Sequence, residues 1–116
     1  MRRKVGKETG LIRVILEYLA YKKVWSYRCN TGGLRDSTGR LVRFGVPGHP
    51  DIVARLRPIG YTGFSGRVIW IEAKSESGRL TPAQEAWREL AAVHGDIYIV
   101  ARRLEDVSEV LSGLQK

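Results

Sequence analysis

Two apolar stretches separated by a turn-rich segment constrain the fold of this chain more than any other feature. Residues 52–56 and 68–71 consist mainly of isoleucine, valine and other apolar residues, and the segment between them contains proline, serine and several glycines. Such a pattern predicts two strands joined as an antiparallel hairpin. With a chain reversal near residues 61–64, the numbers of facing residues are expected to sum to about 125.

Charged residues stand at one end of this predicted hairpin, where a folding core has no use for them. Asp51 precedes the first strand, whereas Glu72 and Lys74 follow the apolar part of the second. Side chains two residues apart project from the same face of a strand, so Glu72 and Lys74 share a side. The expected register sets Asp51 opposite Lys74 and Glu72 about one or two places along, with neighbours roughly 5–8 Å apart. Two carboxylates at that distance can share a cation, which would offset the cost of burying them.

The remaining segments predict an α/β domain in which helices flank a mixed central sheet. Apolar residues at helical spacing predict a helix over residues 8–23, and residues 24–29 predict a strand. The apolar patch at residues 41–44 is expected to be a short strand or a hairpin within a substrate-facing loop. Residues 97–101 form a short apolar run after a helix, which favours a buried strand parallel to its neighbour. Residues 104–114 predict a last helix.

The helix that follows the hairpin has the clearest start signal. Thr81 occupies the N-cap position, Pro82 the first helical position and Gln84 the capping-box position. Gly95 is expected to end this helix. The main elements then follow the order α-β-β-β-α-β-α, with one short additional strand and no repeat, linker or low-complexity segment. A single domain over residues 1–116 is therefore expected.

The charge of the chain indicates a polyanionic partner. Lysine and arginine outnumber the acids 20 to 12 among 116 residues, and the formal net charge of +8 favours nucleic acid. The alternatives are a cationic protein without such a partner, or one that meets an acidic membrane surface. No helix shows the aromatic face and lysine stripe of an interfacial anchor, and no apolar run approaches the roughly 20 residues of a membrane span.

The N-terminus and the cysteine content point to an ordinary cytoplasmic protein. The basic first residues are not followed by an apolar signal segment, so a cytoplasmic location without membrane contact is expected. The lone Cys29 excludes an internal disulfide and a cysteine-based zinc site, and it is interpreted as a simple thiol.

Two acids and a lysine beside a nucleic-acid partner suit phosphodiester hydrolysis. That reaction needs an activated water, stabilisation of charge on the phosphoryl oxygens and help for the leaving oxygen, and Mg²⁺ or Mn²⁺ bound by hard oxygen ligands can supply all three. Asp51 and Glu72 are the expected side-chain ligands, and the backbone carbonyl of Ala73 is a further candidate. Lys74 would position or activate the attacking water, or offset charge in the transition state.

Pro50-Asp51 followed by Glu72-Ala73-Lys74 resembles the signature of the PD-(D/E)xK nuclease superfamily. The surrounding residues are similar to the VRR-NUC family in its short, stand-alone form, which is typical of phages and bacteria. The resemblance covers about residues 8–107 and is carried by Trp25 through Arg28, Asn30-Thr31-Gly32-Gly33, Gly39-Arg40, Arg43-Phe44-Gly45, Gly48-x-Pro50-Asp51, Ile71-Glu72-Ala73-Lys74, Gly78-Arg79-Leu80-Thr81-Pro82, Gln84 and Val100-Ala101-Arg102.

The resemblance implies a restriction-endonuclease-like fold and a metal-dependent endonuclease that recognises DNA structure rather than DNA sequence. Small members of the family are associated with homodimers that cut branched DNA such as Holliday junctions, in a bacterial cell or a phage-infected host. The resemblance also implies a catalytic triad of Asp51, Glu72 and Lys74, with Gln84 supporting the site.

A glutamate on the first helix belongs to the same family pattern, and this chain has two candidates for it. Glu8 fits the opening pattern better and would be both a catalytic residue and a metal ligand, whereas Glu17 lies deeper in the predicted helix. The chain departs from the family at Ile12, where Gln or Glu is often found. Glu8 could instead be a first-turn charge that interacts with the helix dipole, and Gln84 could be a capping residue only.

Other interpretations stay open at this level. The enzyme could act on flaps, duplex ends or restriction sites, or the domain could be a non-catalytic module that binds nucleic acid on a nuclease fold. Five polar residues near the site in sequence suit contacts to phosphates, although the arginines among them could equally be ordinary surface residues: Arg28, Asn30, Arg40, Arg43 and Arg79. The tryptophans are expected in the core or at a dimer contact rather than as platforms for bases: Trp25, Trp70 and Trp87.

Overall fold

The protein is known from a computed structural model that describes residues 6–29, 32–56 and 66–114. In chain order the elements are α1 (Gly6–Tyr21), β1 (Trp25–Arg28), β2 (Gly32–Arg35), β3 (Leu41–Phe44), β4 (Ile52–Leu56), β5 (Arg67–Ala73), α2 (Pro82–Val93), β6 (Ile97–Ala101) and α3 (Leu104–Leu114). Every predicted helix and strand is present, with ends that differ by about two residues at most, which is the usual uncertainty of such boundaries. Strand β2 shows that the predicted 41–44 patch is one half of a hairpin.

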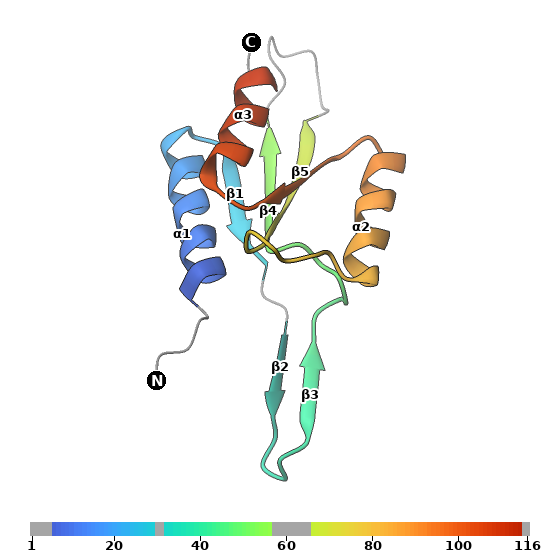
Figure 1. Cartoon of the computed structure of the whole chain (residues 1–116). Coiled ribbons are helices and arrows are strands. Elements are labelled where there is room, and N and C mark those ends of the chain that lie inside the picture. The colour runs from blue at the N-terminus through green and yellow to red at the C-terminus, as the bar shows by residue number, and fades with distance from the viewer. Residues whose placement is uncertain (1–5, 30–31, 57–65, 115–116) are drawn as a thin grey trace.

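Four of the strands form a mixed sheet with helices on both faces (Figure 1). Their order is β1-β4-β5-β6; β4 pairs antiparallel with β1 and with β5, whereas β5 and β6 are parallel. The parallel pairing predicted for residues 97–101 is therefore confirmed. A parallel neighbour requires a crossover connection, and helix α2 provides it between β5 and β6.

The register of the β4–β5 hairpin differs from the prediction by two residues. Ile52 pairs with Ile71 and Val53 pairs with Trp70. Continued by one residue, this ladder sets Asp51 beside Glu72, whereas the predicted register set it opposite Lys74. A shift of two leaves every side chain on its predicted face, because only an odd shift moves side chains to the other face.

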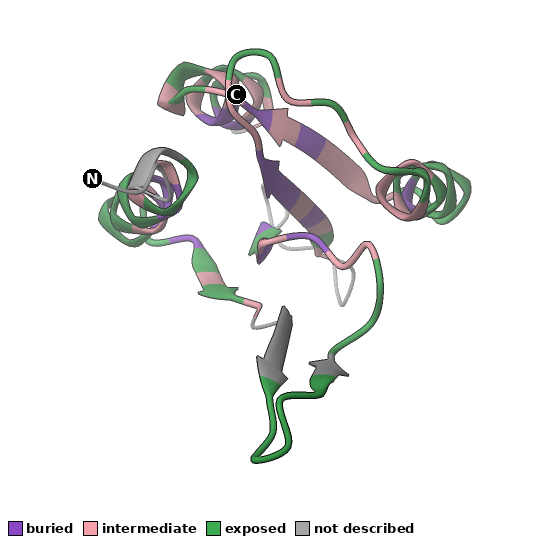
Figure 2. Cartoon of the chain, turned by 60° about the horizontal axis from the view of Figure 1, so that its bottom comes forward, coloured by how far each residue is buried: buried purple, intermediate pink, exposed green. Residues whose placement is uncertain are grey.

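Helices α1 and α3 cover one face of the sheet and enclose the hydrophobic core (Figure 2). Ile15 and Leu19 of α1 and Leu111 of α3 are fully buried there, together with Ile52 and Ile71 of the central strands. Complete burial of a side chain of this size contributes about 1.5–3 kcal/mol to the free energy of unfolding. This face therefore supplies the main apolar stabilisation of the fold.

Helix α2 lies against the other face, where aromatic side chains replace aliphatic ones. Trp87 of α2 packs edge-on against Trp70 of β5, with ring centroids 5.4 Å apart. His49 joins them, at 4.6 Å from Trp87 and 5.7 Å from Trp70. The indole N–H of Trp70 donates a hydrogen bond to Asp96 Oδ2 at 2.9 Å. The prediction of core positions thus holds only in part for Trp70 and Trp87, which are half-buried in this cluster but do not belong to the hydrophobic core on the opposite face.

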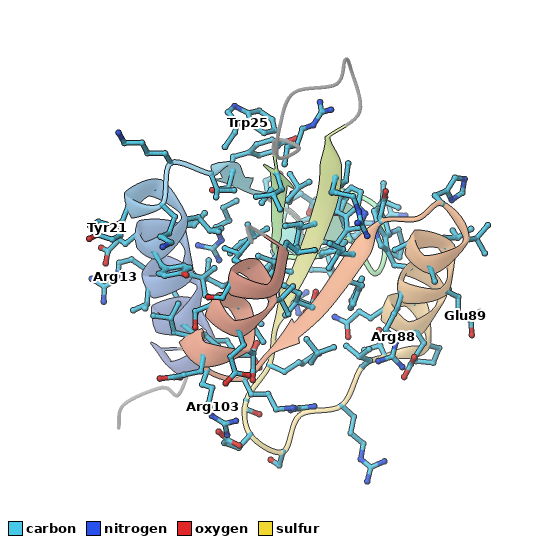
Figure 3. The ribbon with its side chains drawn as sticks, turned by 90° about the horizontal axis from the view of Figure 1, so that it is seen from above. Arg13, Tyr21, Trp25, Arg88, Glu89 and Arg103 are labelled. Atoms are coloured by element: carbon cyan, nitrogen blue, oxygen red, sulfur yellow. The ribbon has the colours of Figure 1, made fainter. Side chains whose placement is uncertain are left out.

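The same prediction is wrong for Trp25. Its side chain is 59% exposed and lies at the surface of the molecule (Figure 3), where it packs edge-on against Tyr27 at a centroid distance of 5.2 Å. The cause is its place in the edge strand β1, since the cross-strand pairs put Tyr27, Val53 and Trp70 in one row on the face that α2 covers. Helix α2 packs at the opposite, β6 side of that face, so Trp25 stays in solvent. A dimer contact through Trp25 remains a prediction.

Strands β2 and β3 form a separate two-stranded sheet that extends away from the rest of the molecule (Figure 1). None of the described core residues comes from these two strands. Among the helices that the structure describes, none has the length and apolarity needed to cross a membrane.

Candidate active site

The two predicted acids lie side by side at the ends of the central strands. Asp51 stands directly before β4, and Glu72 is the second-last residue of β5. Asp51 Oδ2 accepts a hydrogen bond from the backbone N–H of Ala73 at 2.9 Å. On the other side, the backbone carbonyl of Asp51 accepts the N–H of Cys29 at 2.7 Å. Asp51 is therefore held from both neighbouring strands, and its carboxylate is turned toward β5.

Glu72 is the one charged residue that the structure describes as buried, at 4% exposure. Its Oε2 accepts a hydrogen bond from Gln84 Nε2 at 3.1 Å and lies 4.0 Å from the ammonium nitrogen of Lys74. Its Oε1 is buried as well and has no hydrogen-bond partner among the described residues. An ionised oxygen in that position is unfavourable without a cation, because burial removes its solvation.

The environment of Glu72 changes its protonation strongly. Burial, the main cause, and the negative charge of the neighbouring Asp51 together raise the pKa of Glu72 to about 8. Lys74 acts in the opposite direction, and Glu8 adds a small increase. When both carboxylates are ionised, their negative charges repel one another at close range. A divalent cation bound between them would relieve this repulsion.

Gln84 connects the start of α2 to Glu72. Its Oε1 accepts the backbone N–H of Thr81 at 2.8 Å, while Thr81 Oγ1 accepts the backbone N–H of Gln84 at 3.2 Å, so the predicted capping box is confirmed. The N–H of Thr81 can only donate, which requires the amide oxygen to face it and the amide nitrogen to face Glu72. Capping and support of the site, which the sequence left as alternatives, are combined in this one amide.

The first-helix acid that reaches the site is Glu8. Its Oε2 accepts the backbone N–H of Ser75 at 3.2 Å, directly after Lys74. Glu17 is exposed and lies roughly two and a half turns further along α1. Between the two candidates, the structure brings Glu8 and not Glu17 to the end of β5.

The predicted phosphate-contact residues are spread around the site rather than gathered in it. Arg28 ends β1, Arg79 lies in the loop before α2, and Arg40 lies at the tip of the β2–β3 hairpin; all three side chains are exposed. Arg43 is a residue of β3. Asn30 falls outside the described residues.

One residue that supports the site was not predicted. The guanidinium of Arg102, just after β6, donates hydrogen bonds to the backbone carbonyls of Ser75 and Glu76. Arg103 binds the carboxylate of Glu76 at 2.7 Å. These bonds hold the loop that follows Lys74, and with it the N–H that Glu8 binds. The signal in the sequence was Val100-Ala101-Arg102, which carried part of the family resemblance without a role assigned to the arginine.

The donors at the site suit a hard cation, although few of them are side chains. Within the described part of the chain, no three His, Cys, Asp or Glu residues come together in a way that could hold a metal ion. Asp51 and Glu72 supply two carboxylates, and Ala73 follows Glu72, with its backbone N–H bound to Asp51. Mg²⁺ is commonly held by one or two carboxylates and completes its shell with water and substrate phosphates.

Compared with models of protein families, with curated proteins and with solved structures, the chain gives no match. The function is therefore inferred from the side chains themselves.

Proposed function

We propose that this protein is a Mg²⁺- or Mn²⁺-dependent endonuclease of the VRR-NUC type that hydrolyses phosphodiester bonds in branched DNA such as Holliday junctions. The observation that carries the proposal is the pairing of Asp51 with the buried Glu72, beside Lys74. Two acids and a lysine at adjacent strand ends have no role in the core, which lies on the other side of the sheet. They do suit a cation and a phosphate.

The unpartnered Oε1 of Glu72 supports a metal ion at this place. Asp51, Glu72 and the backbone carbonyl of Ala73 would hold it, with Glu8 at the edge of the site. A bound divalent cation supplies Lewis acidity and a reactive water at neutral pH. Its positive charge would also offset the repulsion between the Asp51 and Glu72 carboxylates. In the protein alone, this repulsion contributes to the raised pKa of Glu72.

The residues of the chain itself have separate tasks in this proposal. Lys74, 4.0 Å from Glu72, places its ammonium group where it can orient the attacking water and offset negative charge on the phosphoryl oxygens. Gln84 holds Glu72 Oε2, and the N–H of Ala73 holds Asp51 Oδ2. Each acid thus keeps one oxygen for positioning and presents the other for binding, which limits the movement of the site during the reaction.

The substrate follows from charge and shape. A net charge of +8 favours DNA, and the exposed arginines on β1, on the hairpin and before α2 are suited to phosphates on more than one side of the site. A homodimer would place two such sites about a two-fold axis, as symmetrical cutting of a four-way junction requires.

A cleavage assay on defined DNAs tests this proposal. Purified protein with Mg²⁺ or Mn²⁺ is incubated with labelled linear, flap and four-way DNA, beside the variants Asp51→Asn and Lys74→Ala. We expect the four-way DNA to be cut fastest by the wild type and not measurably by the variants, which should still bind it and retain the far-UV circular dichroism of the wild type. Cleavage by either variant at a rate near the wild type would show that the site is misassigned.

The same experiment separates the alternative functions. Preferential cutting of flaps or duplex ends would indicate a different nuclease specificity at the same site. Salt-dependent binding without cleavage by the wild type, in either metal, would favour a non-catalytic binding module. Binding that does not weaken between about 50 and 200 mM salt would argue against DNA as the partner, because phosphate contacts release counterions.

A further inference from the structure

The β2–β3 hairpin is an arm that extends away from the body of the molecule (Figure 1), and none of its described side chains belongs to the hydrophobic core. This arm, residues 32–44, consists of two four-residue strands and a short turn (Figure 2). It contributes to the elongated shape of the molecule, whose extents are 54 × 30 × 24 Å. An isolated two-stranded hairpin is at best marginally stable in water, so an arm that forms a sheet of its own suggests a function outside the fold.

The tip of the arm is well ordered by hydrogen bonds. Asp36 Oδ1 accepts from the backbone N–H of Thr38 at 2.9 Å, from its hydroxyl at 2.7 Å and from the backbone N–H of Arg40 at 3.0 Å. The guanidinium of Arg35 donates to the carbonyl of Gly39 at 2.9 Å. Gly39 has a φ of +85°, which favours glycine. The arm therefore presents a preorganised turn, which lowers the entropy lost on binding.

The charge of the arm is almost entirely positive. It carries Arg35, Arg40 and Arg43 and a single acid, Asp36, whose carboxylate is engaged in the turn. The side chains of Arg35 and Arg40 are exposed. Arg28 adds a fourth cation at the foot of the arm, in β1.

The foot of the arm is fixed to the body directly beside the acid site. Gly48 lies so close to α2 that a Cβ on it would be 2.4 Å from the carbonyl oxygen of Ala83. The next residue, His49, packs on the Trp87 and Trp70 rings, and the following proline is fully buried. Asp51 comes next, so only a short anchored segment separates the arm from the candidate active site.

We propose that the β2–β3 arm inserts into the major groove of a duplex segment that adjoins the bond to be cut. The inference deepens the proposed function and rests on it for the nature of the partner. A two-stranded ribbon fits the major groove, which is roughly 12 Å wide, and arginine binds both phosphates and the groove edge of guanine. Four residues per strand at about 3.3 Å each give the ribbon a length of roughly 13 Å before its turn, which is enough to enter the groove.

A second copy of the chain is the other partner that a protruding hairpin could have. The charge of the arm argues against this contact, because arginine outnumbers acidic residues three to one over residues 32–44. DNA is complementary to the arm, whereas the same arm on another copy is not.

The test compares two triple variants of equal charge, both in an Asp51→Asn background that prevents cleavage. The arm variant carries Arg35→Gln, Arg40→Gln and Arg43→Gln. The control variant carries Arg13→Gln, Lys22→Gln and Arg67→Gln, which are exposed positions on the body; Arg13 points outward from α1 in Figure 3. Affinity for a four-way junction is measured by fluorescence anisotropy over a range of salt, and contact with guanine N7 in the major groove by protection from dimethyl sulfate.

We expect the arm variant to lose at least about tenfold in affinity, with a salt dependence of log Kd that is shallower by about 2–3 units, since each phosphate contact accounts for about 0.9. The Asp51→Asn protein should protect guanines on one duplex arm, and the arm variant should not. The control variant should lose less than about threefold. A double variant, Arg40→Gln with Arg43→Gln, keeps the hydrogen bond of Arg35 to the turn and should show an intermediate effect, which excludes collapse of the hairpin as the cause.

Equal behaviour of the arm and control variants, or the absence of guanine protection, would overturn the role of the arm. Conversion of a dimer to a monomer by the arm variant, with unchanged binding of DNA, would overturn it in favour of self-association. Either result is compatible with the proposed nuclease activity, provided that the wild type cleaves the four-way DNA and Asp51→Asn does not. Groove protection by a protein that never cuts would confirm the arm and overturn the nuclease.

Discussion

The carboxylate of Asp51 accepts a hydrogen bond from the backbone N–H of Ala73 at 2.9 Å. This bond joins the residue before β4 to the end of β5. It holds Asp51 beside Glu72 on the face of the sheet that α2 covers. The same bond is a structural contact, so Asp51 contributes to stability as well as to the candidate site.

Two substitutions of Asp51 should separate these contributions. Asn can still accept the N–H of Ala73 through its amide oxygen, whereas Ala leaves that buried donor without a partner. We expect Asp51→Ala to be less stable than Asp51→Asn by about 1–3 kcal/mol, measured by urea unfolding. Both variants remove the charge that raises the pKa of Glu72, so their difference reports the hydrogen bond. Equal stability would mean that the bond to Ala73 does not form in solution.

Gln84 allows a similar separation of capping from support. Gln84→Glu keeps a side chain that suits the capping box with Thr81, but it replaces the donor to Glu72 by a third carboxylate. Gln84→Ala removes both interactions of this side chain, with a loss of roughly 0.5–1.5 kcal/mol for the hydrogen bond from Thr81 alone. We expect Gln84→Glu to bind Mg²⁺ less tightly than the wild type at neutral pH and to cleave DNA measurably more slowly. Its helix content by circular dichroism should be normal. Wild-type cleavage by Gln84→Glu would contradict the support of Glu72 by this amide.

The raised pKa of Glu72 predicts a pH dependence of stability in metal-free buffer. Below its ordinary pKa of 4.5, Glu72 is protonated in both the folded and the unfolded state; between 4.5 and about 8 the folded protein keeps a proton that the unfolded chain has lost. The free energy of unfolding should therefore fall as the pH rises through this window, by at most about 1.4 kcal/mol per pH unit from this group.

Glu72→Gln provides the control for that measurement. Gln cannot ionise, so the variant should lack this component and should be more stable than the wild type at about pH 8.5, relative to about pH 5.5. Urea unfolding at both pH values gives the two slopes. Parallel slopes in the two proteins would show that Glu72 titrates normally in the folded state.

The division of the sheet into an aliphatic face and an α2 face can be checked by truncation. Leu111 of α3 is fully buried in the core, whereas Val93 at the end of α2 is 79% exposed. Leu111→Ala should lower the free energy of unfolding by about 2–5 kcal/mol, and Val93→Ala should change it by about 0.5 kcal/mol or less. A large loss from Val93→Ala would reveal a covered surface at the end of α2, such as a contact between copies.

Local signals in the sequence were sufficient to predict the helices and strands, and the reason is visible in α2. Thr81 and Gln84 satisfy one another across a single turn, so the information needed to begin the helix is contained in four residues. The run at residues 97–101 is similar: a short apolar stretch directly after a helix favours a strand parallel to its neighbour, and β6 is parallel to β5 as expected.

Contacts between distant segments were harder to predict. The predicted β4–β5 register missed by two because the pattern of buried residues is the same in both alignments, and only the connection between the strands decides between them. Arg102 was missed for a related reason, since its bonds go to backbone carbonyls that any residue could provide. Trp25 was misplaced because nothing in the short β1 sequence, Trp-Ser-Tyr-Arg, distinguishes an edge strand from one in the middle of a sheet.

The close approach of Gly48 to Ala83 has a consequence for how this protein can vary. Position 48 has a φ of +80° and no room for even a methyl group. It therefore keeps the base of the hairpin in tight contact with α2, the helix that carries Gln84. A shift of the hairpin would therefore shift α2 as well. The angle at which the hairpin leaves the body is thus coupled to the position of the Glu72 carboxylate, which Gln84 of α2 holds. A protein of this fold whose hairpin points in another direction, to fit a ligand of another shape, must therefore also change the contact between position 48 and α2.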